Sequence, residues 1–235
     1  MRTLNTRARV GMVVAACGVV VGAAGVGSAS GDIIRGSYTL SYTQGVTVQT
    51  PLLGSGQHSV NTTTFQWMRT DTPGPGVDSV VPNAFKTYCI EINQTIGGGQ
   101  HTFDVLTPAD AGFSLNQELW LSRLWGGYQG QVDSSTESAA FQIAVWEVMF
   151  DNGLDLLHGD FKVTGSGNAK TLAQDWLSDV SSEGYDGPQS TLAVLRSESV
   201  QDQLTAVSFS VPSPTSALGL AGVGLLGLRR RRAGW

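Results

Sequence analysis

The stretch that decides the fold runs from Ser134 to Gly153 and reads SSTESAAFQIAVWEVMFDNG. Ser134, followed three residues later by Glu137, forms a capping box, which marks the start of a helix. The pair Asn152-Gly153 is a typical C-terminal stop. Between these signals apolar residues cover every face, and a helix that is apolar all round is buried. The sequence therefore predicts a central helix inside the protein core.

Two further helices are predicted on either side of this one. Thr107-Pro108 is a suitable cap and first-turn pair for a helix that ends at Gly126-Gly127. The stretch from Ala169 to Val180 is amphipathic, with apolar residues at helical spacing. The middle of the chain is therefore predicted to contain three helices.

Strand patterns lie before and after the helices. Apolar and polar residues alternate, or β-formers cluster, in 38–42, 46–48, 64–68, 88–93, 101–106, 191–195 and 204–209. Within 88–93, alternation places Cys89, Glu91 and Asn93 on one side and the three apolar residues on the other. We expect an α+β fold, in which a β-rich sandwich or barrel-like domain carries an insertion of about three helices.

The N-terminus has the features of a signal peptide. Three arginines precede an uncharged apolar stretch, 10–27, and Gly27-Ser28-Ala29 offers small residues for cleavage. We expect signal peptidase to remove residues 1–29 and leave one domain, 30–210. A retained membrane anchor is the alternative. A lipoprotein site at Cys17 is disfavoured because the apolar run continues past it.

The domain 30–210 is strongly acidic. It contains all 19 acidic residues of the chain but only seven of the basic ones, so its net charge is about −12. Such a surface disfavours binding to nucleic acid and to anionic membranes. It remains compatible with cations or basic partners.

The C-terminus has three consecutive parts. Val211-Pro212-Ser213-Pro214 is followed by the uncharged segment 215–228 and then by Arg229, Arg230, Arg231 and Arg232. Residues 211–235 resemble the PEP-CTERM sorting signal of exosortase substrates, with Ser213 in place of the name-giving glutamate. The resemblance implies transient membrane anchoring, removal of the tail by an exosortase-type enzyme, and a final location in the cell envelope or on the extracellular surface.

Cys89 and Gln142 are the candidate functional residues. The chain has two cysteines, and Cys17 lies in the predicted signal peptide, so Cys89 has no partner for a disulfide. Gln142 lies inside the predicted buried helix, where an unpaired amide costs about 1–3 kcal/mol. Its partner is either a backbone group or Cys89. In the second case the thiol attacks the side-chain carbonyl, ammonia leaves, and an internal thioester forms.

Two motifs resemble those of bacterial thioester domains. Tyr88-Cys89-Ile90-Glu91 matches an aromatic-Cys-apolar-acidic motif, and Phe141-Gln142-Ile143-Ala144-Val145-Trp146 matches an apolar-Gln-x-Ala-apolar-Trp motif. These domains belong to surface adhesins that bind amines covalently. The resemblance implies a Cys89–Gln142 crosslink, with Tyr88, Glu91 and Trp146 in support. Glu91 is either a proton shuttle or a plain hydrogen-bond acceptor.

Other chemistry has weak support in the sequence. The histidines His58, His101 and His158 lack metal-ligand spacing, and Asp151, Asp155 and Asp160 miss the spacing of a calcium loop. We expect no metal, no cofactor and no turnover enzyme. The expected function is covalent attachment to an amine- or hydroxyl-bearing surface or matrix polymer. The alternative is a non-covalent structural protein of the cell surface or exopolysaccharide matrix, in which Cys89 is a buried free thiol.

Overall fold

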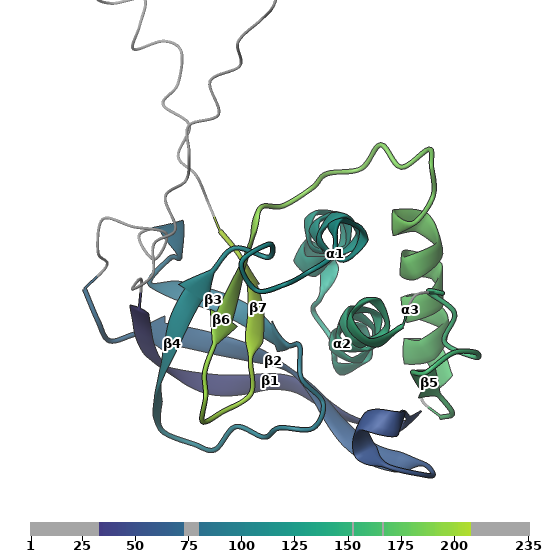
Figure 1. The fold of residues 1–235 in the computed structure, drawn as a ribbon, viewed down its shortest axis with the longest axis horizontal. Helices are drawn as coiled ribbons and strands as arrows, with labels where there is room; N and C mark the ends of the chain where they lie inside the picture. The colour runs from purple at the N-terminus through teal and green to yellow at the C-terminus, as the bar shows by residue number, and fades with distance from the viewer. Residues whose placement is uncertain (1–32, 73–79, 152, 166, 208–235) are drawn as a thin grey trace, which may run out of the picture.

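The computed structural model describes residues 33–72, 80–151, 153–165 and 167–207 (Figure 1). The predicted signal peptide, 1–29, and sorting segment, 211–235, lie outside the described residues. The described strands are β1 (Ile33–Gln49), β2 (His58–Arg69), β3 (Ala84–Cys89), β4 (Gln100–Leu106), β5 (Lys162–Val163), β6 (Leu192–Arg196) and β7 (Gln203–Ala206). The helices are α1 (Leu115–Tyr128), α2 (Ser135–Phe150) and α3 (Gly167–Val180), with short 3-10 turns η1 (Pro51–Leu53) and η3 (Gln129–Gln131). The predicted α+β class is confirmed.

The strands form one antiparallel sheet in the order β2-β3-β7-β6-β4-β1-β5. An additional pairing of β1 with β2 joins the two ends of the first six strands, so these six close into a ring. β1 pairs with β4 near its start and with β2 along most of its length. Its register shifts between Ser41 and Gln44, where Tyr42 has a φ of 59°. The two separate strands predicted at 38–42 and 46–48 are therefore one irregular strand.

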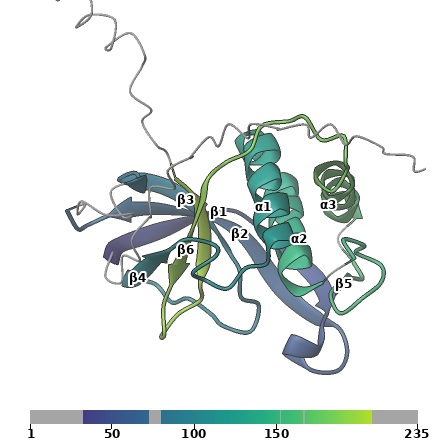
Figure 2. The same cartoon turned by 45° about the horizontal axis from the view of Figure 1, so that its top comes forward.

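The three helices lie together on one side of the strands (Figures 1 and 2). α2 packs against β1, β2 and β3 on one side and against α1 and α3 on the other. Its residues from Ser138 to Val148 are all buried. Ser134 caps the helix and Glu137 bonds back to the Ser134 N–H at 3.0 Å. The predicted buried central helix and its capping box are confirmed.

The predicted start of the first helix is wrong. α1 begins at Leu115, and Ser114 and Gln117 form its capping box. Residues 107–113 form turns instead, in which the Thr107 hydroxyl accepts a hydrogen bond from the Asp110 N–H at 3.1 Å. Thr107 therefore caps a local turn that does not continue into the helix.

The predicted end of this helix is also wrong, because Gly126 and Gly127 lie within α1. A Cβ atom on Gly126 would lie 2.4 Å from the carbonyl oxygen of Pro188, which is closer than any real contact. Gly126 therefore allows a distant segment to approach the helix backbone. A glycine in a helical pattern can mark the end of the helix or a close approach of another backbone, and Gly126 is the second case.

Candidate functional site

The site is built on the end of β3. The ladder between β2 and β3 ends where Phe65 pairs with Thr87. On the other side of β3, Ile90 N–H donates to the Asp202 carbonyl at 3.1 Å. Backbone groups alternate sides along an antiparallel strand. The N–H and C=O of Cys89 therefore point to the side of β3 on which β2 lies, beyond the last pair of the β2–β3 ladder. These two buried groups need partners from elsewhere.

Gln142 supplies both partners. Cys89 N–H donates to Gln142 Oε1 at 3.0 Å, and Gln142 Nε2 donates to the Cys89 carbonyl at 2.7 Å. The side-chain amide thus continues the β3 ladder in place of a strand. Cys89 is 2 % exposed and Gln142 is 1 % exposed, so water does not compete for these bonds. The two predicted residues meet, and the backbone groups that satisfy Gln142 belong to Cys89 itself.

One face of α2 holds Gln142 in this position. Ser138, Gln142 and Trp146 follow one another at four-residue spacing, which places them on the same side of a helix. One turn before Gln142, the Ser138 hydroxyl lies 2.9 Å from the Thr64 hydroxyl, which donates to the Tyr88 hydroxyl at 3.0 Å. This buried chain joins α2, β2 and β3 directly beside the site.

Tyr88 fixes the strand against the helices. Its ring lies 4.4 Å from the Phe141 ring and 5.7 Å from the Trp125 ring, both measured between centroids. Burial raises the pKa of Tyr88 to about 12, so its hydroxyl stays neutral. The supporting role expected for Tyr88 is therefore one of packing and positioning.

The Cys89 sulfur is held by the backbone of Glu91. The thiol donates to the Glu91 carbonyl, and the Glu91 N–H donates to the sulfur at 3.3 Å. Burial raises the pKa of the Cys89 thiol well above its usual value, and the Glu91 backbone contact opposes this only in part. The Trp146 side chain, beside the sulfur, also lowers this pKa, although its Nε1–H is not aligned for a regular hydrogen bond to any described residue. In this arrangement the sulfur is a neutral thiol.

The Glu91 side chain bonds to the start of the β7 region and not to the sulfur. β3 ends at Cys89, and Tyr88, Cys89 and Ile90 are all buried, so the predicted alternation through residue 93 is wrong. The Glu91 carboxylate accepts a hydrogen bond from Asp202 N–H at 2.9 Å. Of the two roles considered for Glu91, proton shuttle and hydrogen-bond acceptor, this contact matches the acceptor.

A pocket of about 380 Å³ lies beside the site. Trp146 and Gln201 form part of its wall. Gln201 Nε2 donates to the Glu91 carbonyl at 3.2 Å and to the Gln94 carbonyl at 2.8 Å. The carbonyl that accepts from the Cys89 thiol is thus held by a side chain that lines the pocket. This pocket was not anticipated from the sequence, because its walls come from β1, β2, α2 and the loops 92–96 and 197–202.

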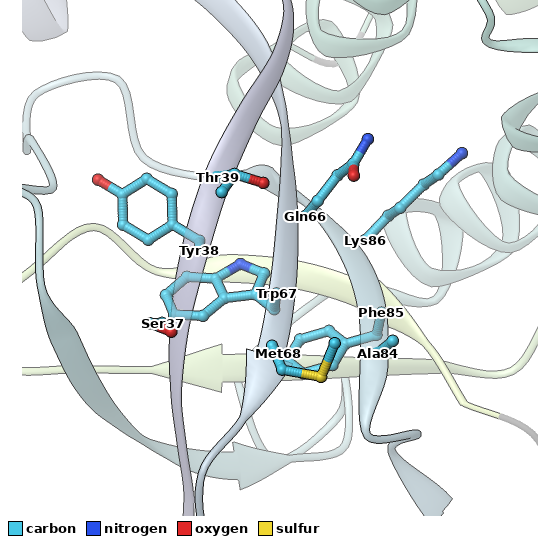
Figure 3. A pocket seen from close by; sticks show the side chains of 9 residues that line it. All are labelled: Ser37, Tyr38, Thr39, Gln66, Trp67, Met68, Ala84, Phe85 and Lys86. Carbon is cyan, nitrogen blue, oxygen red and sulfur yellow. The ribbon is translucent and has the colours of Figure 1, made fainter.

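A second pocket, of about 460 Å³, lies across β1, β2 and β3 (Figure 3). Its lining includes the cross-strand row Thr39, Gln66 and Lys86, and Figure 3 shows the last two side chains running parallel. Neither Cys89 nor Gln142 lines it. The second pocket therefore has no direct connection to the site.

Glu147 is a further buried group that was not identified from the sequence. It lies next to Trp146 on α2, is fully buried, and neither carboxylate oxygen has a hydrogen-bond partner among the described residues. Burial, together with the nearby Asp151 and Asp155 carboxylates, raises the pKa of Glu147 to about 8, and the Asp155 backbone opposes this only in part. Glu147 faces the loop after α2, where Asp151 accepts from the Asp160 N–H at 2.7 Å. Asp151 therefore organises this loop by binding its backbone.

Comparison with protein-family models, with curated protein sequences and with solved structures gave no significant match. In the part of the chain that the structure describes, no helix is both long and apolar enough to cross a membrane. No cluster of three or more His, Cys, Asp or Glu residues suited to a metal ion occurs among the same residues. The sorting residues Pro212, Pro214 and Arg229–Arg232 lie outside the described part.

Proposed function

We propose that this chain is an exported, envelope-sorted surface protein in which Cys89 and Gln142 form an internal thioester for covalent attachment. The observation that supports it is the pair of hydrogen bonds between the Gln142 amide and the Cys89 backbone. These bonds hold the acyl carbon next to the residue whose sulfur must attack it. The two motifs that resemble thioester domains contain the same two residues.

The hydrogen bonds also suit the chemistry. Cys89 N–H donates to Gln142 Oε1, and a donor at this oxygen stabilises the negative charge that develops when a nucleophile adds to the carbonyl. The sulfur is bonded through Cβ to the Cα that lies between the two hydrogen-bonding backbone groups, and the step requires a rotation about Cα–Cβ that brings it to the amide carbon. A carbon–sulfur bond forms, the carbon–nitrogen bond breaks, and the thiol proton leaves with the nitrogen as ammonia.

The raised pKa of the Cys89 thiol slows the first step, because the thiolate is the nucleophile. The same environment protects the product, since a thioester shielded from water is not hydrolysed. Trp146 Nε1–H, which is buried and has no partner among the described residues, is placed to stabilise charge on the sulfur. Formation is therefore slow but occurs once per molecule, and the acyl group remains available for a surface or matrix nucleophile.

The alternative is a non-covalent structural protein of the surface or matrix with a free thiol at Cys89. The neutral thiol and the hydrogen bonds that the Gln142 amide makes through both its oxygen and its nitrogen favour it. In that case Gln142 serves only to complete the β3 ladder. The two functions share the same contacts and differ in one covalent bond.

Peptide mass spectrometry of the protein from its native host tests the bond. Trypsin cleavage at Lys86, Arg123 and Lys162 gives peptides 87–123 and 124–162, which contain Cys89 and Gln142 respectively. We expect a crosslinked pair whose mass is the sum of the two peptides less one ammonia. Gln174 provides the matched control, because its amide also bonds two backbone groups but has no neighbouring cysteine. Two separate peptides, with Cys89 alkylated by iodoacetamide in the unfolded protein, would contradict the proposal.

A further inference from the structure

We propose that the pocket beside Trp146 binds a neutral polyhydroxylated acceptor, such as a saccharide chain, whose hydroxyl group opens the Cys89–Gln142 thioester to give an ester at Gln142. This inference rests on the thioester of the proposed function and specifies which nucleophile it takes. It follows from the position of the pocket, from its lining, and from the absence of charge in that lining.

The pocket and the site share a wall. Trp146 lines the pocket and is only 3 % exposed, while its indole acts on the Cys89 thiol. Gln201 also lines the pocket and binds the Glu91 carbonyl that holds the sulfur. A molecule in the pocket therefore contacts Trp146, which acts on the thiol, and Gln201, which holds the carbonyl that accepts from it. In this proposal, movement of the Trp146 side chain lets a bound nucleophile reach the acyl group.

The lining offers hydrogen bonds without charge. Six polar side chains contribute, namely Ser59, Asn61, Thr63, Gln94, Thr95 and Gln201, and none of the described residues that line the pocket is charged. The side chains of Ser59, Asn61, Gln94 and Thr95 make no hydrogen bond with any described residue. Amide and hydroxyl groups both donate and accept, which matches the hydroxyl groups of a saccharide.

Apolar side chains supply the remaining surface, and three of them are aromatic. Of these three, Phe65 and Trp146 are almost fully buried, whereas Tyr38 is half-buried and offers aromatic surface on which the C–H face of a sugar ring packs well. A protonated amine would find no carboxylate among these residues. The net charge of about −12 on the domain attracts cations in general, but it acts at long range and is screened by salt. The Glu91 and Asp202 carboxylates act on the Cys89 thiol from outside the lining, so the pocket residues themselves are neutral and favour a neutral acceptor.

The transfer step balances without an added reagent. The acceptor oxygen bonds to the Gln142 acyl carbon, the carbon–sulfur bond breaks, and the acceptor hydroxyl proton passes to the Cys89 sulfur. The products are an ester at Gln142 and a free Cys89 thiol. Burial raises the pKa of this thiol. The sulfur that leaves the acyl carbon therefore takes up the proton readily, which favours the products.

The test uses the full chain, with intact mass recorded before and after incubation with each probe. The probes are maltotetraose, as a neutral polyol, and N-acetyl-lysine amide, as an amine, at equal concentration. We expect a mass gain of one maltotetraose, located on peptide 124–162 and removed by mild alkali. Asn61→Ala and Gln94→Ala should each slow this addition about fivefold, the scale of one neutral hydrogen bond. Gln66→Ala, which alters an exposed glutamine of the second pocket, is the control and should leave the rate unchanged.

The outcomes separate the two proposals. If the starting protein has not lost ammonia, the proposed function fails, and this inference fails with it. If ammonia is lost but only the amine adds, the thioester stands and the polyol inference is overturned. The polyol inference is also overturned if ammonia is lost but neither probe adds. It is overturned as well if maltotetraose adds to the Asn61 and Gln94 variants as fast as to the wild type.

Discussion

Cys89→Ala separates the covalent from the non-covalent interpretation by the size of its effect on stability. The substitution removes the sulfur but keeps the backbone N–H and C=O to which Gln142 bonds. Without a crosslink, only a buried thiol is lost, and about 1 kcal/mol is the expected cost. With a crosslink, the substitution also releases a closed loop of 53 residues.

The cost of that release follows from chain entropy. The relation developed for disulfides gives about 4 kcal/mol at 25 °C for a loop of this length. The total loss in the free energy of unfolding is then about 5 kcal/mol. For a domain of this size each kcal/mol shifts the melting temperature by about 2–4 °C. The crosslinked protein should therefore lose about 10–20 °C, and the uncrosslinked one about 2–4 °C.

Urea unfolding, followed by tryptophan fluorescence, measures the difference directly. A crosslink also restricts the unfolded chain, so Cys89→Ala should increase the m-value because more surface becomes exposed on unfolding. Gln174→Ala removes two hydrogen bonds, to Leu154 and Leu156, without any crosslink, so as a control it should lower stability and leave the m-value unchanged. A Cys89→Ala variant that melts within about 4 °C of the wild type, with an unchanged m-value, would refute the thioester.

Three further outcomes are expected. The free energy of unfolding should fall as the pH rises from about 4.5 to 8, because Glu147 keeps its proton in the folded state while the unfolded carboxyl has lost it. Urea unfolding of Glu147→Gln at several pH values should show a smaller dependence of that free energy on pH. An unchanged dependence would contradict the raised pKa of Glu147. Gly126→Ala should destabilise the protein by about 1–3 kcal/mol through overpacking against Pro188, whereas Gly130→Ala, whose Cβ meets nothing within 4 Å, should be tolerated in the same melting assay. The tail 211–235 should be missing from protein isolated from its native host, and C-terminal peptide mapping that recovers it intact would count against sorting.

Local signals predicted α2 well, because its capping box and its apolar faces lie within one stretch. Ser134 and Glu137 are three residues apart, so the start of the helix depends on no distant contact. α1 was less predictable, since both Thr107 and Ser114 can cap a turn. Ser114 forms a capping box with Gln117 and Thr107 caps only a turn, whereas the approach of Pro188 explains why Gly126 lies within the helix.

The site was predictable in its residues but not in its geometry. Burial of Gln142 and the lack of a disulfide partner for Cys89 were both evident from the sequence. The hydrogen bonds between them depend on where the ladder between β2 and β3 ends, which is a property of the whole ring. Glu147 and the pocket lining were not anticipated for the same reason, because they depend on how α2, β2 and the loop before β4 pack together.

The Cys89–Gln142 contacts have a structural explanation and a chemical one, and Gln142→Glu separates them. A neutral glutamic acid can replace both hydrogen bonds, since its O–H donates to the Cys89 carbonyl and its C=O accepts from the N–H. It cannot release ammonia, so no thioester forms by this route. If Gln142 is only structural, the variant should match wild-type stability at low pH and lose stability once its carboxyl ionises. If the wild type is crosslinked, the variant should remain about 4 kcal/mol less stable even at low pH. Urea unfolding of both proteins at about pH 4 decides between the two, because protonation then removes the charge penalty and leaves only the missing covalent bond.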